Sequence, residues 1–154
     1  MSWFARLMYR ALVWKERQRA LRARRSPGQR RSESEHLKTG ERGETLAYWY
    51  LRQAGYTIVA RNRRSRSGAG ELDLVGWDGP ILAFVEVKTR MTTEAGPPEA
   101  AVAGSKQKRI AKAAKEYLRR LKGKPVNYRF DIVSVEWDPK AGLQPRLIKD
   151  AFKA

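Results

Sequence analysis

The chain contains no cysteine and a single histidine, His36. The lack of cysteine excludes disulfides, thiolate nucleophiles, iron–sulfur clusters and Cys-ligated zinc. A single histidine disfavours a Ser–His–Asp triad, a two-histidine zinc site and a histidine-based nuclease site. Any chemistry therefore depends on carboxylates, lysine, arginine, hydroxyls or a hard metal ion. The absence of cysteine also fits a reducing cytoplasm, which is the location we expect.

Long apolar runs and acidic residues are also scarce. No segment approaches the roughly 20 apolar residues that cross a bilayer. The 154 residues include 33 Lys and Arg against 16 Asp and Glu, which gives a formal net charge of +17. This length suits one domain with a modest core. The charge predicts a polyanionic partner, either nucleic acid or an anionic membrane surface.

The composition divides the chain into three parts. Residues 1–25 are predicted to form a basic amphipathic helical extension, because apolar residues recur at near-helical spacing among arginines. Three interpretations of this helix remain open: it covers part of the domain or pairs with a second copy, it is a nucleic-acid arm, or it lies on a membrane surface. Residues 26–39 have the composition of a polar linker, and residues 40–154 are predicted to form the main domain.

The main domain is predicted to be α/β, with the element order α-β-β-β-α-β and a further short strand at residues 146–151. A helix is expected at residues 41–54, ending at Gly55, and another at residues 105–122 with Ser105 as its N-cap. The remaining strands are expected at residues 56–62, 71–76, 81–88 and 128–137. Together these elements predict a mixed β-sheet flanked by helices.

The segment GELDLVGWDGPILAFVEVKTR predicts a two-stranded hairpin that contains Asp73, Glu86 and Lys88. Both strands are largely apolar, so charged side chains inside them require an explanation. Two carboxylates beside an ammonium group on a half-buried sheet face would form a site for a hard divalent cation and a water molecule.

The arrangement of these charges depends on the register of the hairpin. If Gly76 pairs with Ile81, Asp73 lies opposite Phe84, and Asp73, Glu86 and Lys88 project from one sheet face, because strand side chains alternate. A one-residue slip would separate the two carboxylates. The apolar residues expected on the other face are Leu72, Leu74, Ala83, Val85 and Val87.

Several segments together resemble a known family. GERGE, GELDLV and FVEVKTR, followed by a helix and RFDIVSVEW, have the order and spacing of the YraN-like family. These small bacterial proteins are often described as endonuclease-like and akin to archaeal Holliday-junction resolvases. More broadly, the pattern resembles the PD-(D/E)xK nuclease superfamily, whose fold is restriction endonuclease-like. The resemblance covers about residues 38–137, and Leu72 stands where the superfamily motif often has proline.

The resemblance implies a role for four residues. The superfamily's motif Asp and Glu bind Mg²⁺ (or Mn²⁺), its Lys activates or orients the attacking water, and a helix Glu often assists. The matching positions here are Asp73, Glu86, Lys88 and Glu44. The implied activity is hydrolysis of phosphodiester bonds in branched or otherwise structured DNA, in repair or recombination. The alternatives are a structural ion pair between Lys88 and Glu86, and a Glu44 that only stabilises its helix N-terminus.

Basic residues outside the metal motif are candidates for phosphate contacts. Arg90 follows Lys88 in the strand alternation and is either a phosphate contact or ordinary surface charge. Asp131 either supports the metal site or pairs with Arg129 or with a lysine of a helix. The other candidates for nucleic-acid binding are Arg63, Arg64, Arg66, Lys106, Lys108 and Arg109.

Three functional hypotheses follow from these residues. The first is a metal-dependent, nucleoid-associated endonuclease that acts on structured DNA, for which junction cutting would favour a homodimer. The second is a non-catalytic nucleic-acid-binding protein on the same fold. The third is a protein that docks on a membrane surface or a partner through residues 1–25.

Overall fold

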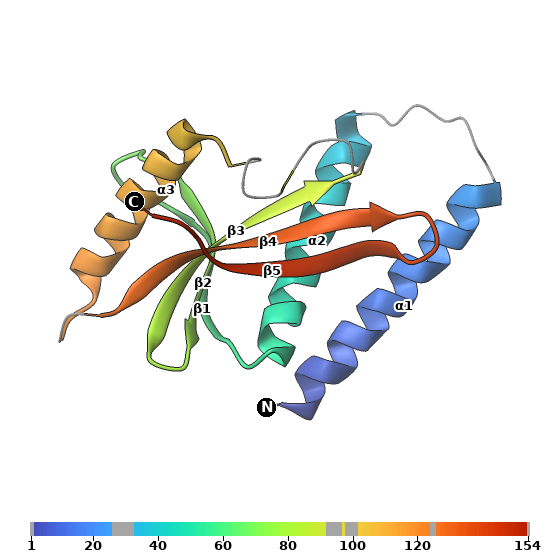
Figure 1. The fold of residues 1–154 in the computed structure, drawn as a ribbon, viewed down its shortest axis with the longest axis horizontal. Helices are drawn as coiled ribbons and strands as arrows, with labels where there is room; N and C mark the ends of the chain where they lie inside the picture. Colours follow the sequence, from blue (N-terminus) through green and yellow to red (C-terminus); the bar gives the residue numbers. More distant parts are fainter. Residues whose placement is uncertain (1, 26–32, 92–96, 98–101, 124–125, 154) are drawn as a thin grey trace.

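The computed structural model describes residues 2–25, 33–91, 97, 102–123 and 126–153 (Figure 1). The helices are α1 (Trp3–Arg25), α2 (Glu33–Gln53) and α3 (Gly104–Arg120). The strands are β1 (Thr57–Arg64), β2 (Glu71–Asp78), β3 (Ile81–Arg90), β4 (Tyr128–Asp138) and β5 (Gly142–Phe152). This order confirms the predicted α/β class.

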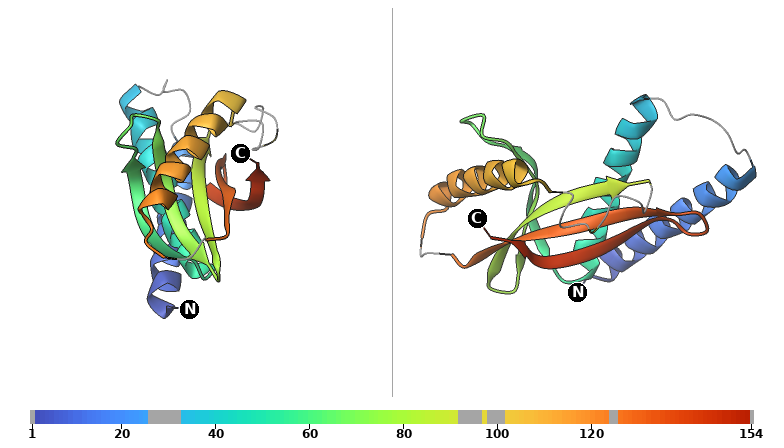
Figure 2. Two further views of the ribbon diagram at one scale, coloured as in Figure 1. Left: turned by 90° about the vertical axis from the view of Figure 1, so that its left-hand side faces the viewer. Right: turned by 45° about the horizontal axis from the view of Figure 1, so that its top comes forward.

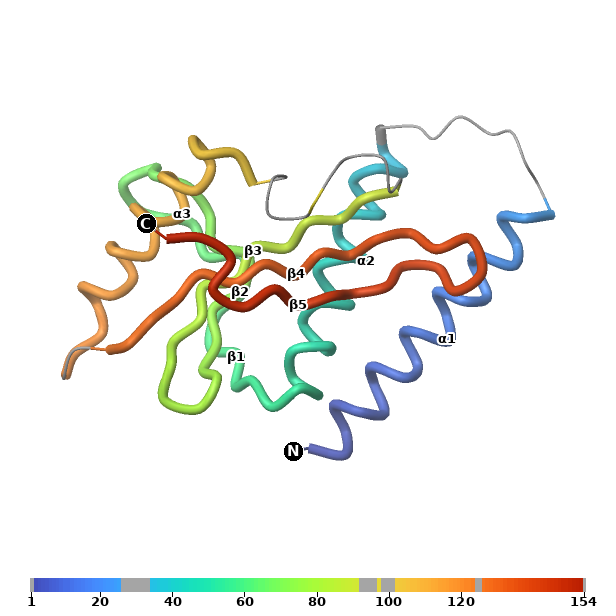
Figure 3. Tube along the Cα trace, in the orientation of Figure 1, coloured from blue at the N-terminus to red at the C-terminus, as the bar shows by residue number. Residues whose placement is uncertain are grey.

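The five strands form one sheet in the order β1-β2-β3-β4-β5. Neighbouring strands are antiparallel except β3 and β4, which are parallel. A parallel pair requires a crossover connection, and Figure 3 shows that α3 lies in the connection between β3 and β4. The sheet is therefore mixed and flanked by helices, as predicted.

The sheet separates two apolar clusters. On one face, Phe84 and Ile132 pack in a cluster with Ile110 of α3. On the other face, Val85 and Val133 pack with Leu51 of α2. Adjacent residues of β3 thus contribute to opposite clusters, which is the alternation expected of a strand buried on both sides. The two helices cover opposite faces, and strand β3 lies between them.

Two predicted helix starts were wrong. Helix α2 begins at Glu33, so residues 33–39 of the predicted linker are helical; residues 26–32 lie outside the described residues. Residues 33–39 contain few apolar residues, so hydrophobic periodicity could not reveal this first part of α2. Helix α3 has Ala103 at its N-cap, without a side-chain cap hydrogen bond, so Ser105 lies inside its first turn. The predicted helix end is confirmed, because Gly55 follows α2 with a φ of 101°.

The last strand is longer than predicted. Strand β5 begins at Gly142 rather than at residue 146, and it pairs with β4 as an antiparallel hairpin. Pro145 obscured the strand pattern in the sequence. Proline is tolerated here because β5 lies at the edge of the sheet.

Helix α1 packs on the domain through a buried polar residue. Glu16 is 4% exposed. Its Oε2 lies 2.6 Å from Nη2 of Arg42 on α2, and its Oε1 lies 2.6 Å from Nη1 of Arg19. A side chain at Gly142 would overlap the Glu16 carbonyl, so glycine allows the β4–β5 hairpin to approach α1 closely. The helix thus covers part of the domain, as the first interpretation expects.

Candidate functional site

The β2–β3 hairpin has a different register from the predicted one. Its turn consists of Gly79 and Pro80, and Gly76 pairs with Ala83 rather than with Ile81. The predicted pairing was wrong because β2 continues through Asp78, which shortens the turn. The difference is two residues along β3, so Ala83, Val85 and Val87 of β3 still share the sheet face that the prediction gave them.

The observed register brings Asp73 and Glu86 together at the end of the β2–β3 ladder, where the last aligned pair is Leu74 and Val85. The two carboxyl groups lie close enough for the charge of Asp73 to raise the pKa of Glu86. Oδ2 of Asp73 also accepts a hydrogen bond of 2.8 Å from the backbone N–H of Val87. The predicted position of Asp73 opposite Phe84 was therefore wrong, but the predicted proximity of the two acids is present.

Burial raises the pKa of both acids of this carboxylate pair, Asp73 and Glu86. Glu86 is only 7% exposed. Desolvation and, after it, the charge of Asp73 raise the pKa of Glu86 to about 7. Desolvation also raises the pKa of Asp73, against the hydrogen bond from Val87. Two adjacent desolvated carboxyl groups therefore tend to retain a proton or to attract a cation near neutral pH.

The cation nearest to this pair comes from α3. Nζ of Lys106 lies 3.1 Å from Oε1 of Glu86, and the lysine side chain is 42% exposed. The alternative of a structural ion pair between Glu86 and Lys88 is not observed, because the partner of Glu86 is Lys106. Lys88 is exposed, and it makes no salt bridge within the described residues. Lys106, predicted only as a phosphate contact, thus borders the carboxylate pair.

Glu44 approaches the pair from α2. It is half-buried, and desolvation followed by the charge of Asp73 raises its pKa. A hydrogen bond with Asn62 of β1 acts in the opposite direction. The preceding residue, Gly43, permits this approach, because a side chain there would overlap the Thr89 hydroxyl at the end of β3. Glu44 therefore lies close enough to Asp73 for the charge of Asp73 to raise the pKa of Glu44.

Asn62 was not foreseen as a neighbour of the site. It lies between Arg61, which pairs with Leu74, and Arg63, which pairs with Leu72, and is therefore level with Asp73. Its φ of 46° is left-handed, a conformation that asparagine tolerates better than most residues. A residue with this φ changes the direction in which the neighbouring side chains of the strand point.

The apolar neighbours of Asp73 do not all follow the predicted alternation. Leu72 packs in the cluster beneath α3, whereas Leu74 packs in the cluster beneath α2. The prediction that both leucines share a face was therefore wrong. The left-handed Asn62 on the neighbouring strand marks the point where the regular alternation ends. Asp73 lies at this irregularity, between the two helix-covered faces.

Asp131 belongs to a different network. It is fully buried. Its Oδ1 accepts hydrogen bonds of 2.8 Å from Nε of Arg129 and 2.9 Å from the backbone N–H of Asp150. Nη2 of Arg129 also lies 2.6 Å from Oδ2 of Asp78. Of the two interpretations of Asp131, the pairing with Arg129 is the observed one.

The predicted phosphate contacts differ in their exposure. Arg90 is 8% exposed and donates a hydrogen bond of 3.1 Å to the carbonyl of Pro97, so its placement at the surface was wrong. The charge pattern could not reveal this burial. Arg64 lies 3.5 Å from Glu71 in an exposed ion pair. The exposed candidates are Arg63, Arg64, Arg66, Lys108 and Arg109.

One side of α3 forms a basic groove. Lys108, Lys112 and Lys115 of α3, together with Lys153 after β5, line a cleft of about 480 Å³. Lys106 precedes this row on the same helix and contacts Glu86. The cleft itself therefore presents four lysines, the kind of side chain expected to contact phosphate, and Lys106 is not among its lining residues.

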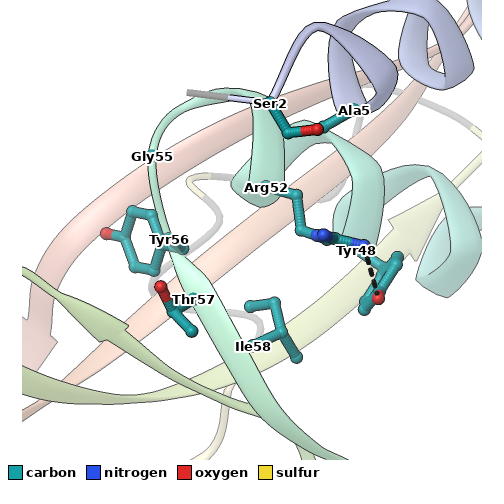
Figure 4. Close-up of a pocket in the computed structure, with 8 residues that line it drawn as sticks. All are labelled: Ser2, Ala5, Tyr48, Arg52, Gly55, Tyr56, Thr57 and Ile58. Atoms are coloured by element: carbon teal, nitrogen blue, oxygen red, sulfur yellow. Dashed lines mark hydrogen bonds between the residues drawn. The ribbon is translucent and has the colours of Figure 1, made fainter.

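A second cleft of about 480 Å³ lies where α1 begins, α2 ends and β1 begins (Figure 4). Nη1 of Arg52 donates a hydrogen bond of 3.1 Å to the Tyr48 hydroxyl at its wall. None of the site residues predicted from the sequence lines this cleft. This cleft is therefore separate from the carboxylate pair.

These features define an α/β protein with a mixed five-stranded sheet and an adjacent pair of acids, one half-buried and one buried, between helices on its two faces. A family model described as "Uncharacterised protein family UPF0102" matches residues 43–135. The chain belongs to this family, which confirms the resemblance to YraN-like proteins. The matched region contains the carboxylate pair, Glu44, Lys88 and Lys106, and excludes α1.

Similar proteins come from several bacteria. A UPF0102 protein of Koribacter versatilis is 50% identical over 121 residues, which are 78% of this chain and 82% of the relative. One from Symbiobacterium thermophilum is 49% identical over 117 residues, 76% of this chain and 98% of the relative. One from Solibacter usitatus is 56% identical over 96 residues, 62% of this chain and 73% of the relative.

Proposed function

We propose that this protein is a metal-dependent endonuclease-like hydrolase that cleaves phosphodiester bonds in branched or otherwise structured DNA. The observation that carries the proposal is the adjacent, desolvated pair of Asp73 and Glu86, with Nζ of Lys106 at 3.1 Å from Glu86. Perturbed acids that converge on one position are typical of functional sites. The net charge of +17 supports a polyanionic substrate.

The chemistry of the donors fits Mg²⁺ or Mn²⁺. The described residues contain no group of three or more His, Asp or Glu side chains arranged to hold a metal ion. Mg²⁺ does not need such a group, because it is usually bound by one or two carboxylates and keeps several waters. Asp73 and Glu86 would hold the ion. Its positive charge would offset the repulsion between the two carboxylates, which otherwise favours retention of a proton. When bound, it supplies charge neutralisation at the phosphate and activation of a water.

The surrounding residues take separate roles in this proposal. Lys88 follows Glu86 by two residues on β3 and is exposed, so it is available to orient the attacking water or to move its proton. Glu44 contributes a further carboxylate on the α2 side and assists in positioning water. The lysines of the α3 groove hold the DNA backbone without reading its sequence.

A non-catalytic DNA-binding protein is the second candidate, and one specific contact favours it. Nζ of Lys106 lies 3.1 Å from Oε1 of Glu86, so a cation of the protein itself pairs with this acid. A buried acid neutralised in this way could be purely structural, in which case the basic surface would bind DNA without cutting it. Measurement of DNA cleavage distinguishes the two candidate functions.

The test is cleavage of labelled branched, duplex and single-stranded DNA in Mg²⁺ or Mn²⁺. The variants are Asp73→Asn and Lys88→Ala, and Glu71→Gln serves as a control carboxylate on the same strand as Asp73. We expect cutting that requires the metal, is lost in the first two variants and persists in the control, while DNA binding is retained in all. Binding by every variant without cutting by the wild type would instead support the second candidate.

A further inference from the structure

The outer side of α1 carries large apolar side chains that face solvent. Trp3 is 73% exposed, Leu7 52%, Trp14 62% and Leu21 43%. Successive members are four or seven residues apart, so they form one stripe along the helix. The opposite side contacts the domain through Ala5, Glu16 and Ala20, which are buried. The residues of the apolar stripe are therefore different from those that hold α1 on the domain.

The charge around this stripe has one sign. Arg10, Arg17 and Arg24 are exposed and lie beside the apolar residues at the same seven-residue spacing. The only acidic residue of α1 is Glu16, which is buried and paired with arginines. The exposed surface of the helix thus combines tryptophan, leucine and arginine without a negative charge. This combination is typical of helices that lie in the interface of an anionic membrane.

Charge and shape disfavour two other occupants. Pairing of α1 with a second copy would bring the arginines of two identical seams together, and neither helix has an exposed acid to neutralise them. A DNA backbone would satisfy the arginines, but it offers little to four large apolar side chains between them. Anionic phospholipids satisfy both groups, since their headgroups pair with arginine and their interfacial region accepts tryptophan and leucine.

We propose that α1 docks the protein on a membrane surface rich in anionic phospholipids, with the stripe of Trp3, Leu7, Trp14 and Leu21 inserted at the headgroup level. The helix would lie in the plane of the interface. No described helix is long and apolar enough to cross a membrane. The contact is therefore peripheral and reversible, and its strength depends on both the apolar area and the salt concentration.

This docking surface is separate from the candidate active site. Figure 1 and the right-hand view of Figure 2 place α1 at one end of the molecule and α3, with its lysines, at the other. Helix α1 also lies outside residues 43–135, which the family model matches. Membrane docking can therefore be present or absent independently of DNA cleavage.

The experiment is flotation of the full chain with vesicles of phosphatidylcholine, with and without phosphatidylglycerol. The disrupting variant is Trp14→Ser with Leu21→Ser, both at exposed positions. The matched control is Leu37→Ser, because Leu37 is 68% exposed on α2. A third variant, Arg10→Gln with Arg17→Gln, tests the charge. Thermal unfolding of each variant verifies the fold, and DNA retention at low salt provides a readout independent of lipid.

We expect the wild type and the Leu37→Ser control to float with phosphatidylglycerol vesicles and not with pure phosphatidylcholine. The serine pair should lower partitioning roughly tenfold, and the glutamine pair by a similar factor. DNA retention by the serine pair should equal that of the wild type. The proposal is overturned if the wild type does not float with anionic vesicles, or if the serine pair floats to the same extent as the control. A wild-type dimer that the serine pair dissociates, without any vesicle binding, would make a second copy the occupant instead.

Discussion

Replacing Glu86 with glutamine should remove most of the pH dependence of stability that arises from the carboxylate pair. The pKa of Glu86 is raised from 4.5 to about 7 in the folded protein, first by desolvation and then by Asp73. At about 1.4 kcal/mol per pKa unit, this difference corresponds to about 3 kcal/mol of folding free energy.

The sign of this effect follows from proton binding. Between pH 4.5 and about 7 the folded state holds the Glu86 proton more tightly than the unfolded state does. The stabilising contribution is therefore complete below pH 4.5 and is lost as the pH rises through about 7. The unfolding free energy of the wild type, relative to Glu86→Gln, should fall by about 3 kcal/mol over this interval.

Urea denaturation at a series of pH values measures this difference directly. The wild type, Glu86→Gln and the control Glu71→Gln should be compared in metal-free buffer, with tryptophan fluorescence and circular dichroism as probes. The control should track the wild type, because the charge of Glu71 contributes only a minor part of the shift at Asp73. A flat difference between the wild type and Glu86→Gln from acid to neutral pH would refute the argument that burial beside Asp73 raises the pKa of Glu86.

Three other features of the structure give measurable expectations. Gly43→Ala should destabilise the protein by about 1–3 kcal/mol in urea, because its methyl group meets the Thr89 hydroxyl, and Thr89→Ala in the same chain should recover part of the loss. Arg129→Met should cost about 3–5 kcal/mol by the same assay, since it leaves the fully buried Asp131 without its arginine. Lys108→Gln should reduce the slope of log DNA affinity against log salt by about 1, as expected for the loss of one phosphate contact.

The sequence contained enough information to bring the two acids together, although the hairpin register was wrong. Side chains on a strand alternate, so a two-residue error in the pairing of Gly76 left Asp73 and Glu86 as neighbours. The alternation could not predict that Leu72 packs beneath α3, at the level where Asn62 of the neighbouring strand has a left-handed φ. Positive φ at a non-glycine residue has no reliable signature in a single sequence.

Contacts between distant elements were the main part that the sequence could not predict. The ion pair of Lys106 with Glu86 depends on how α3 crosses the sheet, and no local pattern records this. Arg90 showed the same limit, because a charged residue at the end of a strand is normally exposed and here it is buried against Pro97. The amphipathic pattern of α1 predicted the helix but left its packing on the domain undecided.

The central claim is that Asp73 and Glu86 form a site for a divalent cation, and binding of Mn²⁺ tests it most directly. Electron paramagnetic resonance of free Mn²⁺, titrated with the wild type, Asp73→Asn and Glu71→Gln, measures the bound fraction without requiring a DNA substrate. We predict saturable binding of one ion to the wild type and to Glu71→Gln, and loss of this binding in Asp73→Asn. Equal binding by all three proteins, or none by the wild type at millimolar Mn²⁺, would contradict the claim.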